Sequence, residues 1–253
     1  MIERWRQELG RPVVVGHRGA MAEAPENTLA SFQRAVELGA DVVELDVHAS
    51  ADGVPVVIHD DTLERTTDGQ GPVARLPLAA LRALDAGSWF GPQFAGERVP
   101  TLDEALEWSR GRVPLAVEIK GSPCPTPDLV DAVVRALQRH AALERAIVIA
   151  FDHPALRLAR ELEPRLHCGV LYECRPVDAP ALAKAAGAEA LLPHWSFVTP
   201  EDVQAAHEAG LALQPWETSD PVVLERLFAA GVDGVASNRP DVARQVLARW
   251  QRG

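Results

Sequence analysis

The sequence predicts an α/β protein of the (β/α)8 TIM-barrel class, in which eight parallel strands form a barrel inside a ring of helices. Short apolar runs alternate with segments of helical period along the whole chain. Eight such strand–helix units follow one another, and strict alternation of this kind indicates a parallel sheet. The length of 253 residues suits one barrel, so we expect a single domain over residues 1–253.

The expected strands are short runs rich in Val, Ile and Leu. They comprise residues 13–16, 41–47, 114–119, 146–151, 168–172, 189–193, 211–216 and 233–237. The segments between them repeat apolar residues at helical spacing, and several begin at Thr, Asp or Pro and end at Gly. These signals predict a helix after each strand. The first of these helices is expected to start at Glu26-Asn27-Thr28, with Asn27 as its cap.

An additional apolar run, PVVIH at 55–59, breaks this alternation. About six residues, including Asp52 and Gly53, separate it from the second strand, whereas a parallel crossover needs about a dozen. The run is therefore predicted to form a hairpin, antiparallel to an extension of the second strand. We expect an insertion at about 49–100, which ends where Thr101 and Glu104 form a capping box for the next helix.

Charge and composition exclude several classes of partner. A formal net charge of −11 disfavours nucleic acids, which bind Lys/Arg-rich surfaces, but leaves room for a local site that binds one small phosphate. The three cysteines lack metal-site spacing and indicate free thiols in a reducing compartment. The charged N-terminus lacks the apolar core of a signal peptide, and no run of about 18 apolar residues occurs. We therefore expect a cytoplasmic protein without stable membrane insertion. The oligomeric state stays unknown at the level of sequence.

Polar residues occur where the first three barrel strands end, at positions where a barrel core would use Val or Leu. In a barrel, the catalytic groups gather at the C-terminal ends of the strands. The first, second and third strands contribute two candidates each: His17 and Arg18, Glu44 and Asp46, and Glu118 and Lys120.

The acidic candidates predict a metal site. Glu44 and Asp46 are two residues apart on a strand, so they point to one face with Cα atoms roughly 6.5 Å apart. Two carboxylates in one small space repel and need a cation between them. Glu118 can add a third oxygen donor. Such a set selects a hard ion, Mg²⁺ or Ca²⁺ with Mn²⁺ as an alternative, and not Zn²⁺. The hairpin brings His59 to about the height of these acids.

Together, two histidines, a metal and two cationic side chains suit the hydrolysis of a phosphodiester. Arg18 can bind phosphate oxygens bidentately, and Lys120 can neutralise charge that develops on them. One of His17 and His59 can take a proton from the nucleophile while the other gives one to the leaving alkoxide. The glycines that flank His17 and Arg18 are expected to let the backbone approach the ligand.

Motifs spread over nearly the whole chain resemble those of the glycerophosphodiester phosphodiesterase family, in its bacterial, cytoplasmic type. They are GHRG (16–19), PENT (25–28), ELDV (44–47), DGVPVVIHDDTLERTTDGQG (52–71), VEIK (117–120), AFDH (150–153) and GVDGVASNRPD (231–241). The resemblance implies a barrel with an insertion after strand two. It also implies a divalent ion at Glu44, Asp46 and Glu118, and His17 and His59 as the acid/base pair. The implied reaction converts a glycerophosphodiester and water to glycerol 3-phosphate and an alcohol.

Two stretches depart from the family pattern at the top of the barrel. Family members often read W-T-V-N after strand seven, where this chain has Trp216-Glu217-Thr218-Ser219. They often carry Thr-Asp before the late Pro-Asp, where this chain has Ser237-Asn238. These departures leave the substrate preference open. Phe151 and Trp216 are candidates for the substrate pocket, with Trp216 either a wall for the glycerol group or part of the core.

Several alternatives remain open at the level of sequence. Arg18 can pair with Glu26, and Glu118 with Lys120, as purely structural ion pairs. Water can attack phosphorus directly, or the adjacent glycerol hydroxyl can attack first and give a cyclic phosphate. A related barrel enzyme acting on lysophospholipids or sphingolipids is a second candidate, because SWFGPQF (88–94) offers an apolar rim. A barrel that binds a phosphorylated metabolite without turnover is the third.

Overall fold

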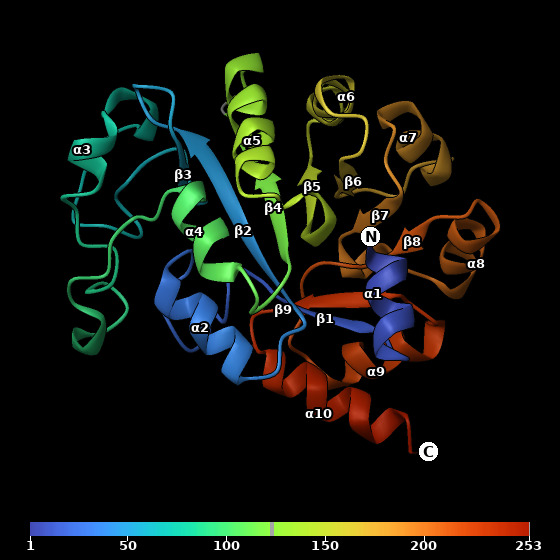
Figure 1. The fold of residues 1–253 in the computed structure, drawn as a ribbon. Coiled ribbons are helices and arrows are strands. Elements are labelled where there is room, and N and C mark those ends of the chain that lie inside the picture. Colours follow the sequence, from blue (N-terminus) through green and yellow to red (C-terminus); the bar gives the residue numbers. More distant parts are fainter. Residues whose placement is uncertain (122–123, 253) are drawn as a thin grey trace.

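The computed structural model describes residues 1–121 and 124–252, which form a nearly closed barrel of parallel strands surrounded by helices (Figure 1). The barrel strands are β1 (Val13–Gly16), β2 (Val42–Ala49), β4 (Leu115–Ile119), β5 (Ala146–Ala150), β6 (His167–Tyr172), β7 (Ala190–Pro193), β8 (Ala212–Leu213) and β9 (Gly234–Ser237). Their spatial order is β8-β7-β6-β5-β4-β2-β1-β9. Backbone hydrogen bonds from Asp233 to Leu213 (2.9 Å) and from Ala236 to Pro215 (3.0 Å) link β9 to the chain around β8. The predicted fold class is confirmed.

The helices surround the strands (Figure 1). They are α1 (Ile2–Leu9), α2 (Leu29–Glu37), α3 (Leu78–Leu81), α4 (Leu102–Ser109), α5 (Pro127–Arg139), α6 (His153–Leu162), α7 (Ala179–Ala186), α8 (Pro200–Glu208), α9 (Pro221–Ala230) and α10 (Pro240–Trp250). Of these, α2, α4, α5, α6, α7, α8 and α9 each begin at a side-chain cap. The predicted capping box is present, because Thr101 Oγ1 accepts from the Glu104 amide while the Glu104 carboxylate accepts from the Thr101 amide. The predicted cap of the first barrel helix is wrong. Thr28, not Asn27, caps α2 by accepting a hydrogen bond from the Ser31 amide.

Alternation along each strand divides the core into two layers. Val14 points outward and packs beneath the helices, whereas Val13 and Val15 point into the barrel. Helix α1 places Ile2 and Trp5 against this interior cluster. Burying a side chain such as Ile2 stabilises the fold by roughly 1.5–3 kcal/mol relative to leaving it exposed. Apolar packing therefore fills the N-terminal half of the barrel interior.

On β2 and β4, the inward-pointing residues change from apolar to acidic toward the C-terminal ends of the strands. Val42 packs into the interior cluster, and Glu44 and Asp46 follow it at alternate positions along β2. On β4, Ala116 is an interior residue and Glu118 is the next one on the same face. The alternation that points apolar residues into the core thus also points three carboxylates into the C-terminal end of the barrel.

The additional apolar run forms β3 (Pro55–Val57), which pairs antiparallel with the extension of β2. Val57 lies opposite Val47, and the Ile58 amide donates to the Asp46 carbonyl at 3.0 Å. The chain between β3 and α4 contains the short elements η1 (Val73–Arg75), α3 and η2 (Pro92–Phe94) and lies to one side of the barrel (Figure 1). It packs on an apolar cluster of its own: Val56, Ile58, Leu63, Val73, Leu81, Ala86 and Val99. The hairpin delivers the residue after Ile58 to the barrel opening.

None of the helices within residues 1–121 and 124–252 has both the length and the apolar character needed to cross a bilayer.

Candidate active site

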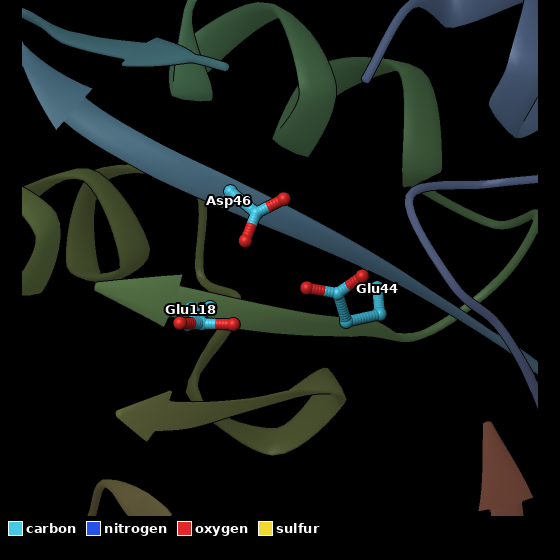
Figure 2. A group of neighbouring side chains, drawn as sticks. All are labelled: Glu44, Asp46 and Glu118. Atoms are coloured by element: carbon cyan, nitrogen blue, oxygen red, sulfur yellow. The ribbon is translucent and has the colours of Figure 1, made fainter. Parts of the chain in front are cut away.

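Three carboxylates meet inside the barrel opening. Asp46 on β2 lies in register with Glu118 on β4, and Glu44 lies two residues before Asp46, on the same face of β2 (Figure 2). One oxygen from each lies within 4.8 Å of the others, and all three residues are buried. Glu44 Oε1 and Asp46 Oδ1 have no hydrogen-bond partner among the described residues. Buried oxygens without a partner, drawn only from carboxylates, fit a hard divalent cation.

The protonation of these acids reflects their crowding. Burial raises the pKa of Glu44 well above its usual value, and Asp46 and Glu118 add to the shift. Burial and the charge of Asp46 also raise the pKa of Glu118 to about 7, although Lys120 opposes this. Burial alone would raise the pKa of Asp46 as well, but Arg18, Lys120 and the other cationic neighbours outweigh it and hold that pKa far below its usual value. In the absence of a cation, the cluster therefore retains protons near neutral pH.

Asn27 fixes the orientation of Asp46 and was not predicted to have this role. Its side-chain Nδ2 donates to Asp46 Oδ2 at 2.8 Å, and its Oδ1 accepts from the Asp46 backbone amide at 3.2 Å. Asn27 has a φ of 59°, a left-handed conformation that Asn tolerates better than most residues. The signal in the sequence was the PENT stretch at 25–28, in which a cap and a ligand-positioning residue are adjacent and hard to distinguish.

Arg18 lies across the same acids. Its backbone, at a φ of 49°, directs the amide N–H to Glu44 Oε2 at 2.7 Å. Its guanidinium donates to Glu26 at 2.8 Å and lies 3.4 Å from Asp46 Oδ2. The structural ion pair with Glu26 is therefore present. Because that pair uses only part of the guanidinium and Arg18 lines the pocket, the residue retains donors for a ligand.

Close contacts within the turn after β1 require the two glycines that flank His17 and Arg18. A Cβ at Gly16 would lie 2.5 Å from the carbonyl oxygen of Gly19, and one at Gly19 would lie 2.4 Å from Ser31 Oγ. Gly19 also has a φ of 86°. These residues are glycine because the turn after β1 closes tightly on itself and on α2, which in turn sets the position of Arg18. That these glycines also let the backbone approach a ligand stays a prediction.

Lys120 extends over the cluster from the end of β4. Its Nζ donates to Glu118 Oε1 at 2.9 Å and lies 3.7 Å from Asp46 Oδ1. Burial would lower the pKa of Lys120, but Asp46 and Glu118 outweigh it and raise the pKa above its usual value. The structure thus contains the Glu118–Lys120 ion pair that the sequence left open, and Lys120 is a fixed positive charge at the pocket wall.

The two predicted catalytic histidines line one pocket, and each has a different partner on Nδ1. His59 Nδ1 lies 2.7 Å from the carboxylate of Asp60, which also accepts from Arg65. Arg65 in turn donates to both oxygens of Glu26. Burial and then the cationic neighbours lower the pKa of His59, against the charge of Asp46. A chain of charged groups therefore holds the hairpin to the segment that carries Arg18.

His17 is held instead by an amide. Its Nδ1 lies 2.7 Å from Asn238 Oδ1, and Asn238 Nδ2 donates to Glu217 Oε2 at 2.7 Å. Since a carboxylate accepts, this bond orients the amide with its oxygen toward the ring, so Nδ1 carries the hydrogen and Nε2 is left free. Burial, with Arg18 nearby, lowers the pKa of His17 to about 4. Sequence reasoning noted positions 217 and 238 only as departures and did not assign them this role.

The pocket has a polar half and an apolar half. The polar half is formed by His17, Arg18, Glu44, His59, Glu118 and Lys120. The opposite half comes from the later strands: Ile149, Phe151, Leu171, Leu192, Gln214, Trp216 and Ala236. The space among them, including the part open to solvent, is about 440 Å³. Every predicted site residue lines this pocket except Asp46, which is buried beside it.

Aromatic side chains form one edge of the apolar half. Phe151 and Trp216 meet nearly at right angles with ring centroids 5.3 Å apart, and Phe151 remains 43% exposed. The ring centroid of His194 lies 5.1 Å from that of Trp216, although no sequence motif places His194 near the site. His48, which shares a face with Glu44 and Asp46, binds the backbone carbonyl of His59 through Nε2. His48 therefore supports the hairpin.

Comparisons with known proteins agree with this geometry. Residues 17–242 match the family described as "Glycerophosphoryl diester phosphodiesterase family". The chain is 39% identical over 232 residues to a glycerophosphodiester phosphodiesterase of Caldanaerobacter subterraneus, covering 91% of this chain and 96% of that protein. It is 33% identical to a glycerophosphodiester phosphodiesterase of Bacillus subtilis, covering 93% of this chain and 86% of that protein.

Solved structures give the same picture. A phosphodiesterase from Oleispira antarctica, in complex with the product sn-glycerol-3-phosphate, superposes with a TM-score of 0.88 at 34% identity, covering 94% of this chain and 97% of that chain. A putative glycerophosphoryl diester phosphodiesterase from Silicibacter pomeroyi also superposes with a TM-score of 0.88, at 30% identity, over 95% of this chain and 94% of that chain.

Proposed function

The chain belongs to the glycerophosphoryl diester phosphodiesterase family, and we propose that it is a metal-dependent enzyme that hydrolyses small glycerophosphodiesters to glycerol 3-phosphate and an alcohol. The observation that carries this proposal is the meeting of three buried carboxylates, two histidines and two cationic side chains in one pocket. The product bound to the Oleispira antarctica relative supports glycerol 3-phosphate as the product here.

Glu44, Asp46 and Glu118 would hold one divalent cation, which is Mg²⁺ or Ca²⁺, with Mn²⁺ as an alternative. When bound, such an ion polarises a phosphoryl oxygen and neutralises negative charge in the transition state. The donor set supports this assignment because the unpartnered oxygens of Glu44 and Asp46 require a positive charge that Arg18 and Lys120 supply only in part.

The phosphate group of the substrate is bound by the cationic side chains of the polar half. Arg18 presents a planar fork to two phosphate oxygens, and Lys120 adds a point charge beside Glu118. Both groups are fixed by acids before the substrate arrives, so little reorganisation is needed as negative charge develops on the phosphoryl oxygens.

The two histidines transfer the protons. His17 has a hydrogen on Nδ1 and a free Nε2, an arrangement suited to accepting a proton. His59 is backed by the carboxylate of Asp60, which opposes the lowering of its pKa by burial and suits it to donating a proton to the leaving alkoxide. The nucleophile is either water or the adjacent glycerol hydroxyl. Full activity on a substrate that lacks the 2-hydroxyl excludes obligatory attack by that hydroxyl.

A second candidate, hydrolysis of lysophospholipids or sphingolipids, is favoured by one observation. Trp89, Phe90 and Phe94 in the insertion stack edge to face, with ring centroids 5.6 and 5.5 Å apart, and Trp89 is 40% exposed. Such a cluster can insert into a lipid surface. Co-sedimentation with liposomes separates the candidates, because an enzyme for soluble substrates stays in the supernatant.

Phosphorus NMR of the reaction provides the direct test. With Mg²⁺ or Ca²⁺ present, glycerophosphoethanolamine or glycerophosphocholine is expected to give the phosphomonoester glycerol 3-phosphate. Intact substrate under both metals would contradict the proposal and favour a barrel that binds a phosphorylated metabolite without turnover.

Cys124, Cys168 and Cys174 are free thiols, which supports the predicted cytoplasmic location.

A further inference from the structure

Gln214 is a polar residue on the apolar side of the pocket. We propose that it is a specificity-determining residue whose side-chain amide binds a hydroxyl group of the substrate. This inference rests on the proposed function, because it assigns a recognition role to the half of the pocket that faces the acid/base and metal-binding residues.

The position of Gln214 is set by the barrel itself. Ala212 on β8 belongs to the interior cluster, and Gln214 follows two residues later on the same face. Its backbone amide donates to the Leu191 carbonyl at 2.9 Å, which continues the pairing of β8 with β7. A Cβ at Gly234 would lie 3.3 Å from Gln214 Cγ, so the side chain lies close against β9 where that strand has no side chain.

The side chain of Gln214 is largely buried, and its amide has no protein partner among the described residues. Gln214 is 4% exposed, and its side chain makes no hydrogen bond with any residue in 1–121 or 124–252. Its neighbours around the pocket wall, Leu192, Trp216 and Ala236, offer mainly apolar surface. The amide is not among the fully buried polar atoms that lack a partner, so it keeps access to the pocket, which Gln214 lines. A ligand group that enters the pocket would supply the hydrogen bonds that the protein does not.

The chemistry of an amide selects the kind of group. Gln214 offers two donors and an acceptor and carries no charge, which matches a hydroxyl that both donates and accepts. The charged part of the substrate already has partners across the pocket in Arg18 and Lys120. The hydroxyl belongs either to the glycerol group or to the leaving alcohol, and experiments can tell these sources apart.

A binding cycle tests the glycerol source. Affinities of glycerol 3-phosphate and n-propyl phosphate, which lacks the hydroxyls, are measured by calorimetry with saturating Mg²⁺ for wild type and Gln214→Met. Met keeps the length and removes the amide. The preference of wild type for glycerol 3-phosphate is expected to fall on the order of tenfold in Gln214→Met. Gln204→Met is the matched control. Gln204 is exposed on α8, where its side chain donates to Glu208, so this variant is expected to keep the ligand preference of wild type.

Steady-state kinetics test the alcohol source. The ratio of kcat/KM for glycerophosphoglycerol to that for glycerophosphocholine is compared between wild type and Gln214→Met. A loss on the order of tenfold in this ratio identifies the leaving alcohol as the source of the hydroxyl, because choline has no free hydroxyl after esterification. Gln214→Asn, which shortens the amide by one methylene, provides a second variant if the Met variant does not fold.

The outcomes separate the two proposals. Unchanged ratios in both arms, or an equal loss on ligands with and without hydroxyls, would overturn the role of Gln214. Wild-type protein that hydrolyses neither diester would instead contradict the proposed function, and the binding cycle would still report on Gln214.

Discussion

His17 Nδ1 lies 2.7 Å from Asn238 Oδ1, so a histidine that lines the pocket is oriented by a neutral amide. The other histidine, His59, is oriented by a carboxylate at the same distance. A carboxylate favours the protonated ring, and an amide oxygen does so far less. Burial lowers the pKa of both rings, that of His17 to about 4 with Arg18 nearby, and the second partner of each ring opposes this shift.

Replacing this amide by an acid should move the pH profile. In Asn238→Asp, a carboxylate beside Nδ1 raises the pKa of His17. As the pH is lowered, the ring then becomes protonated at a higher pH than in wild type and can no longer act as a base. The acidic limb of kcat/KM against pH is expected to shift upward by about one unit or more. Asp60→Asn, which replaces the carboxylate beside His59 by an amide, is the comparison variant. An acidic limb that does not move in Asn238→Asp would contradict the assignment of His17 as the base.

Removing either histidine should remove a proton transfer. His17→Ala and His59→Ala are each expected to reduce kcat by about 10²–10⁴, since general acid–base catalysis contributes factors of this size. Stopped assays with glycerophosphocholine measure the loss. His207→Ala, at a histidine that pairs with Asp233 outside the described pocket, serves as the control with wild-type turnover. A loss below about tenfold would exclude the tested histidine from catalysis.

Arg18→Lys should weaken substrate binding. A lysine keeps the charge and the backbone bond to Glu44, but it loses the planar fork that binds two phosphate oxygens. KM is expected to rise on the order of tenfold, by loss of a charge-assisted bidentate contact. Arg34→Lys on α2, where the side chain pairs with Glu23 and Glu37 at the surface, is the matched control. Equal KM values for wild type and Arg18→Lys would argue against a bidentate phosphate clamp.

Binding of a divalent cation should release protons. The pKa of Glu44 is raised well above its usual value and that of Glu118 to about 7, whereas a metal ligand must be ionised. At pH 7 we expect a release of roughly one proton per ion bound, seen by calorimetry as a dependence of the heat on buffer ionisation enthalpy. Heats that do not depend on the buffer would show that the acids are already ionised without metal.

The same shifts determine how the metal-free protein responds to pH. A carboxyl whose folded pKa is raised stabilises the fold below its unfolded pKa of 4.5, and this contribution is lost as pH rises through about 7. The lowered pKa of His17 acts in the opposite direction, because its contribution is complete above the unfolded pKa of 6.5 and is lost toward pH 4. Added metal should therefore increase the thermal stability most at neutral and higher pH.

The barrel and the acids were predictable because they follow from strand periodicity. Alternation along 42–49 and 115–119 decides which residues point inward, and the run at 55–57 was too close to form a parallel crossover. That spacing alone predicts that His59 lies near Asp46. Local sequence therefore defined the polar half of the pocket, whose residues lie on or just after three strands and one hairpin.

What the sequence did not predict depends on contacts between distant residues. Asn27 meets Asp46 only because the turn after β1 folds under α2, and Glu217 meets Asn238 across the last two strands. The predicted Asn27 cap is wrong because Asn27 has a left-handed φ of 59° and its side chain binds Asp46, which leaves Thr28 to cap α2. Gln214 had no motif around it, and its significance appeared only when the surrounding wall proved to be apolar.

Removal and return of metal tests most directly the claim that Glu44, Asp46 and Glu118 hold a cation on which turnover depends. The rate of glycerol 3-phosphate release from glycerophosphocholine is measured after exhaustive chelation and again after titration with Mg²⁺ or Ca²⁺, for wild type and Asp46→Asn. The account predicts that chelation abolishes wild-type turnover, that one of these ions restores it, and that Asp46→Asn fails to recover at the same concentration. Full turnover in the chelated wild-type enzyme would contradict it.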